Sequence, residues 1–102
     1  MSDRIAHFQA LVQRTPQSEL FRFSLAQALL ADNRGPEARP HLEYCITIKP
    51  DWMLPRILLG KELLAAGRPA EAKPLLEAAL QLAITQNHED PAEELRQILS
   101  GL

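Results

Sequence analysis

The residue types that most often carry out chemistry are few in this chain and widely spaced. One cysteine, Cys45, and three histidines, His7, His41 and His88, are the possible nucleophile, bases or metal ligands. A metal site or a catalytic group needs such residues gathered at a defined spacing, and no local motif gathers these four. The run NHED at 87–90 lacks the ligand spacing of a calcium loop. We therefore predict neither catalysis, nor a metal site, nor a cofactor.

Two arginines and a lysine could instead hold an acidic group of a partner. Arg22 and Arg56 lie 34 residues apart, and Lys61 follows the second of them. Paired arginines suit a carboxylate or a phosphate. We favour a second interpretation, in which each arginine stem covers apolar surface and its head lies in water. The formal net charge of −2, and aromatic residues that do not interleave with basic ones, argue against binding of nucleic acid.

The elements that position these residues follow from an internal repeat. The segment LAQALLADNRGPEARPHLEYCITI, at 25–48, aligns without a gap with LGKELLAAGRPAEAKPLLEAALQL, at 59–82. In each segment, apolar residues at helical spacing precede Asn33 or Gly67, residue types that favour the left-handed conformation at a helix end. A second helix then begins near a proline. The short turn makes the two helices antiparallel neighbours.

The same register extends to both ends and predicts one all-α domain of antiparallel helix–turn–helix repeats over residues 1–102. Aromatic residues are only 5% of the chain, so the core must be aliphatic, which suits helices. The domain divides into a half repeat, two repeats and a capping helix, at 1–17, 18–51, 52–86 and 87–102. We expect helices at residues 3–14, 18–32, 36–48, 52–66, 69–86 and 91–100. Asp90 is the expected N-cap of the last helix.

Two prolines interrupt second helices at equivalent positions. A proline in a helix interior removes a hydrogen bond, and its ring presses on the carbonyl four residues back. Pro40 and Pro74 each follow a small alanine, Ala38 or Ala72, by two residues. They therefore face away from the core, on the side where a lost hydrogen bond is replaced by water. We predict a mild bend near Pro74 and no break.

This pattern resembles the tetratricopeptide repeat, a helix–turn–helix unit that recurs every 34 residues. Its order of large and small residues is matched twice, at Leu25-Ala26, Leu29, Ala38, Leu42, Cys45 and Pro50, and at Leu59-Gly60, Leu63, Ala72, Leu76 and Ala79. The small positions lie where two helices approach closely, so Cys45 is predicted to be a core residue. Arg22 and Arg56 stand where the family often has a large aromatic residue. The short layout is similar to that of small stand-alone bacterial members of the family.

The resemblance implies a concave groove that is lined by the first helix of each repeat and holds a peptide. By register, its lining would be Leu20, Phe23, Gln27, Leu30, Leu54, Ile57, Lys61 and Leu64. A mostly aliphatic groove suits an apolar peptide or an amphipathic helix, with Lys61 orienting an acidic group and Arg56 as a second candidate for that role. The alternative is that the terminal helices cover these side chains and make them core.

The expected function is therefore that of a non-catalytic module that binds a protein or peptide. The alternative is self-association through the groove or an end face, as in stacked repeats. The polar side of the last helix favours a monomer. The first residues, MSDRIAHFQ, lack the apolar core of a signal peptide, and no apolar run reaches the length of a membrane span. Together with the single cysteine, these features predict a cytoplasmic location and no membrane-spanning segment.

Overall fold

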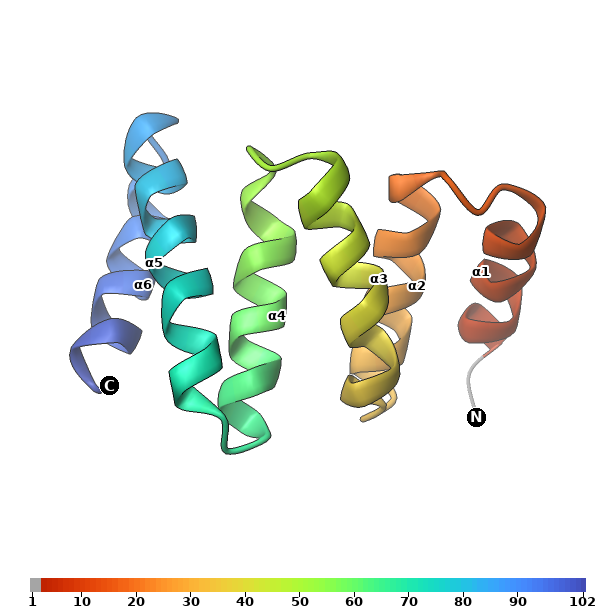
Figure 1. Cartoon of the computed structure of the whole chain (residues 1–102), viewed down its shortest axis with the longest axis horizontal. Helices are drawn as coiled ribbons and strands as arrows, with labels where there is room; N and C mark the ends of the chain where they lie inside the picture. Colours follow the sequence, from red (N-terminus) through yellow and green to blue (C-terminus); the bar gives the residue numbers. More distant parts are fainter. Residues whose placement is uncertain (1–2) are drawn as a thin grey trace. The chain divides into compact units, whose positions relative to one another are not determined.

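The computed structural model describes residues 3–102, and its helices fall into two compact units (Figure 1). The first unit ends at Pro50 and the second begins at Asp51. Over the described residues the chain forms six helices and no strand: α1 (Asp3–Arg14), α2 (Glu19–Ala31) and α3 (Gly35–Ile48) in the first unit, and α4 (Met53–Ala65), α5 (Pro69–Thr85) and α6 (Glu89–Ser100) in the second. The predicted all-α class and the six predicted helices are confirmed.

In each unit two consecutive helices pack as a pair because small residues let them approach closely. α2 packs on α3, and α4 packs on α5. The side chains at the repeated positions are buried, namely Leu25, Ala26, Leu29, Ala38, Leu42 and Cys45 in the first unit, and Leu59, Leu63, Ala72, Leu76 and Ala79 in the second. The approach is tightest at Gly60, where a methyl group would lie 2.6 Å from Cδ2 of Leu76. The predicted repeat of large and small residues is thus the core of each pair.

The turn inside each pair is closed in the same way in both units. Asn33 has a φ of 61° and Gly67 a φ of 75°, the left-handed conformation that the sequence predicts for both. The next residues, Arg34 and Arg68, each donate their backbone N–H to a carbonyl five residues back, at 2.8 and 2.9 Å. Each arginine also forms an ion pair with the glutamate three residues further on, in the first turn of the second helix. These contacts fix where the second helix of each pair begins.

The two internal prolines do not end their helices. Pro40 lies inside α3 and Pro74 lies inside α5, and both helices continue for several residues beyond them. Both prolines are exposed, whereas Ala38 and Ala72, two residues earlier, are fully buried. The missing hydrogen bonds therefore lie on the solvent side, and the prediction that the helix with Pro74 does not break is confirmed.

The start of the last helix differs from the prediction. α6 begins at Glu89 with His88 as its N-cap, so the prediction that Asp90 is the N-cap is wrong. Asn87, with a φ of 59°, ends α5 in the left-handed conformation and turns the chain into α6 at once. Pro91 is consistent with this earlier start, because the first four N–H groups of a helix have no partner within it. α6 then packs on α5, as α1 packs on α2 in the first unit.

Candidate partner-binding surface

The four residues that the sequence assigns to a groove on α2 lie along one side of that helix, at spacings of three and four. They differ in exposure. Leu20 has 60% of its surface exposed and Gln27 is exposed as well, whereas Leu30 is half-buried. Phe23 has only 8% exposed and belongs to the core. α2 can therefore offer an apolar side chain in its first turn and a polar one two turns later.

The corresponding residues of α4 have the same pattern of exposure. Leu54 is 45% exposed and Ile57 is 5% exposed, and the pair repeats the contrast seen in the first unit. Lys61 is exposed and Leu64 is half-buried. Both helices thus carry an exposed stripe of two residues, Leu20 and Gln27 on α2 and Leu54 and Lys61 on α4, which we call the first-helix stripes. That the two stripes form one groove stays a prediction.

The cation of the α4 stripe already has a partner within its own unit. Nζ of Lys61 lies 2.8 Å from Oε2 of Glu94, which projects from α6. Both side chains are about half exposed, and ion pairs of this kind contribute about 0–1 kcal/mol. Loss of this ion pair would therefore cost the fold little stability. The repeat alignment gives no sign of this pair, because Glu94 lies beyond the aligned segments.

Arg22 is partly exposed, and its head forms contacts inside the first unit. Its Nε donates to the carbonyl oxygen of Pro16 at 2.6 Å, and its Cζ lies 4.3 Å from the centre of the Tyr44 ring. Its Nη1 lies 3.5 Å from Nδ1 of His41. Tyr44 in turn donates its hydroxyl to the carbonyl oxygen of Gln17 at 2.9 Å. Arg22 therefore ties α3 to the loop before α2, and this structural role explains an arginine at this position.

Burial sets the chemistry of two titratable side chains in the first unit. Cys45 is fully buried, and its Sγ lies 3.4 Å from the carbonyl oxygen of Glu19. Burial raises the pKa of the Cys45 thiol to about 11, so the thiolate that would act as a nucleophile is scarce at neutral pH. The prediction that Cys45 is a core residue is confirmed. Burial, and after it the charge of Arg22, lowers the pKa of His41.

Neither a metal centre nor a membrane span is present in the part of the chain that the structure describes. Over residues 3–102, no three side chains of His, Cys, Asp or Glu gather closely enough to hold a metal ion. None of the helices in that range combines the length and the apolar character needed to cross a bilayer.

Repeated antiparallel pairs of helices, closed by equivalent turns, define a helical-repeat protein. Two models of the tetratricopeptide repeat match the chain, one at residues 5–51 and the other at residues 53–78. The chain therefore belongs to the tetratricopeptide repeat family. Repeats of this family generally mediate contacts between proteins and serve as scaffolds, and they are generally non-catalytic.

Comparison with solved structures gives the same fold. The solution structure of a protein from Bordetella parapertussis matches with a TM-score of 0.80, over 98% of this chain and 87% of that chain. The two sequences are 24% identical, so the likeness is one of fold. No curated protein matches this chain significantly.

Proposed function

We propose that this chain is a non-catalytic interaction module that binds a partner protein through its first-helix stripes. One observation carries the proposal: Leu20 and Leu54, which are equivalent in the repeat, are both large and aliphatic, and they are 60% and 45% exposed. Scattered exposed leucines are ordinary. Here the exposure recurs at the same turn of both repeats, beside a buried residue that anchors each helix. Packing within either unit does not account for leucine at these two positions.

The proposed partner is an apolar segment or an amphipathic helix with an acidic group. Burial of a leucine side chain against such a segment would contribute about 1.5–3 kcal/mol. Gln27 can both donate and accept hydrogen bonds, and Lys61 can exchange Glu94 for a carboxylate of the partner. The leucines would thus provide affinity and the polar residues would set the orientation. We keep the cytoplasm as the expected compartment.

Affinity capture with two matched double variants tests this proposal. Leu20→Glu/Leu54→Glu places charges on both stripes, whereas Ile48→Glu/Leu102→Glu places the same charges on two other exposed aliphatic residues. We expect the first variant to lose the partners that the wild type and the second variant retain. Ile57→Glu is unsuitable, because Ile57 is 5% exposed and a charge there would unfold the chain. Retention of all partners by the Leu20→Glu/Leu54→Glu variant would show that the stripes do not bind them.

Light scattering after size exclusion separates partner binding from self-association. A monomer at high concentration supports the proposal, since the exposed leucines are then free for another protein. A dimer that Leu20→Glu/Leu54→Glu converts to a monomer would instead assign the stripes to contacts between two copies of this chain.

A further inference from the structure

In both units, a side chain of the second helix donates a hydrogen bond to the segment that precedes the first helix. Tyr44 of α3 donates its hydroxyl to the carbonyl oxygen of Gln17 at 2.9 Å. Nε2 of Gln86, the C-cap of α5, donates to the carbonyl oxygen of Asp51 at 2.9 Å. The two acceptors lie 34 residues apart and are equivalent in the repeat, whereas the two donors are not. Chemically different side chains therefore hold the same backbone carbonyl in both units.

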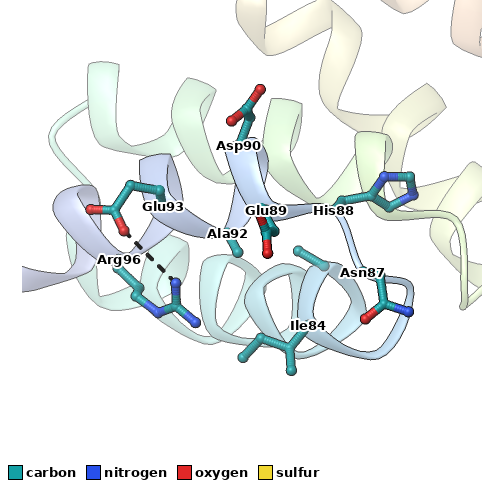
Figure 2. Close-up of a pocket in the computed structure, with 9 residues that line it drawn as sticks. Ile84, Asn87, His88, Glu89, Asp90, Ala92, Glu93 and Arg96 are labelled. Atoms are coloured by element: carbon teal, nitrogen blue, oxygen red, sulfur yellow. Dashed lines mark ion pairs between the residues drawn. The ribbon is translucent and has the colours of Figure 1, made fainter.

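The greater length of α5 supplies the second donor. The residue of α5 that corresponds to Tyr44 is Ala78, whose side chain has no donor. Both second helices begin at equivalent positions, but α3 has 14 residues and α5 has 17, with Gln86 directly after it. Figure 2 shows Asn87 where α5 ends and the chain turns into α6. The additional turn of α5 thus brings Gln86 to the carbonyl that the tyrosine holds in the first unit.

The two held carbonyls directly precede the exposed leucines of the first-helix stripes. Leu20 follows Gln17 by three residues, and Leu54 follows Asp51 by three. Both leucines lie in the first turn of their helices, α2 and α4. The first turn is where a helix frays most easily, because its N–H groups have no partner within the helix. A hydrogen bond from the neighbouring helix therefore restrains the backbone that carries each leucine.

We infer that Tyr44 and Gln86 are positioning residues of the proposed binding surface. They hold the segment in front of each first helix, so that Leu20 and Leu54 are already ordered when a partner arrives. A partner then loses less affinity to the ordering of the surface that it contacts. The recurrence of the bond, despite the change of donor, supports this role over a chance contact. The role rests on the proposed function, because it concerns how the stripes are presented.

Hydrogen exchange of backbone amides tests the restraint without any partner. Tyr44→Phe removes only a hydroxyl, and Gln86→Met keeps the length of the side chain without the donor. Exchange should become about two- to tenfold faster at residues 22–24 in the first variant and at 56–58 in the second, the factor that one net hydrogen bond represents. Thr47→Val removes a bond of 3.0 Å that lies within α3, and it should change neither segment. Unchanged exchange in the two donor variants would overturn the inference.

The affinity for a labelled synthetic helix of leucine and glutamate tests the positioning step. This peptide has the apolar and acidic character proposed for the partner. Tyr44→Phe and Gln86→Met should each weaken binding about two- to tenfold, whereas Thr47→Val should not. In a Leu20→Ala background, Tyr44→Phe should have no further effect, because no leucine remains to be positioned. Gln86→Met should likewise have no further effect in a Leu54→Ala background.

The leucine variants distinguish failure of this role from failure of the proposed function. If Leu20→Ala and Leu54→Ala weaken binding but the donor variants do not, the stripes bind the peptide and the positioning role is wrong. Equal effects of a donor variant with and without its leucine would mean that the hydrogen bond only stabilises the fold, which also overturns the role. If both leucine variants bind as tightly as the wild type, the proposed function fails and the positioning role fails with it.

Discussion

The close approach of α4 and α5 predicts that Gly60→Ala destabilises the wild type but stabilises a variant in which Leu76 is alanine. At Gly60, a Cβ atom would lie 2.6 Å from Cδ2 and 2.7 Å from Cγ of Leu76, well inside van der Waals contact. Leu76 is fully buried, so it has little room to move. Overpacking of this kind costs about 1–3 kcal/mol. Alanine in place of glycine in a helix interior returns about 1 kcal/mol. Gly60→Ala should therefore destabilise the fold by up to about 2 kcal/mol.

In the Leu76→Ala background, the same substitution should stabilise the protein. Leu76→Ala alone should cost about 2–5 kcal/mol, because it removes buried methyl groups and leaves a cavity. The clash at Gly60 then disappears, and the helix propensity of alanine remains, so Gly60→Ala should gain about 1 kcal/mol. The coupling between the two sites should thus be about 1–3 kcal/mol.

Urea unfolding of the four proteins, followed by far-UV circular dichroism, measures this coupling. Gly67→Ala is the control, because a methyl group on Gly67 would contact nothing within 4 Å. Its cost would come from the backbone alone, which has a φ of 75° there. It should cost about 1–2 kcal/mol in both backgrounds, since the strain lies in the backbone. If Gly60→Ala stabilises the wild type, or has the same effect in both backgrounds, the close packing described here is wrong.

Three further predictions concern titratable and charged groups. Because the pKa of His41 is lowered on folding, the unfolded chain binds more protons as the pH falls through about 6.5. Stability should fall there until the folded-state pKa is passed, and His41→Gln should remove that part of the loss in pH-dependent unfolding. The Cys45 thiol, buried and with a pKa of about 11, should react with a disulfide reagent at neutral pH only as fast as the first unit opens. Reaction at the rate of a free thiol would contradict its burial. A double-mutant cycle of Lys61→Ala and Glu94→Ala should give a coupling below about 1 kcal/mol that shrinks with added salt, and a larger coupling would mean that a partner cannot easily displace Glu94.

The repeat predicted most of the fold because the same physical requirement is met twice. Small residues such as Gly60 must face large ones such as Leu76 wherever two helices touch, and this constraint is visible in the sequence. The left-handed turns at Asn33 and Gly67 are predictable for a similar reason, since few residue types adopt that conformation. Pro74 is explained by the same register, which places it on the solvent side of α5.

The start of α6 and the surface contacts could not be predicted in this way. A second left-handed asparagine, Asn87, permits a shorter connection than the proline pattern suggested, and it moved the helix start to Glu89. The pairing of Lys61 with Glu94 depends on how α6 packs in three dimensions, which no spacing along the chain reports. The groove residues were assigned by position in the repeat, but the packed structure was needed to show that Phe23 and Ile57 are buried while the first-helix stripes are exposed.

Titration calorimetry with a partner obtained by affinity capture tests the central claim most directly. We expect the wild type and Ile48→Glu/Leu102→Glu to bind with the same affinity and with a negative heat-capacity change, as burial of apolar surface requires. Leu20→Glu/Leu54→Glu should bind at least about tenfold more weakly, because each buried leucine contributes about 1.5–3 kcal/mol. Equal affinity of all three proteins would show that the first helices do not carry the binding surface.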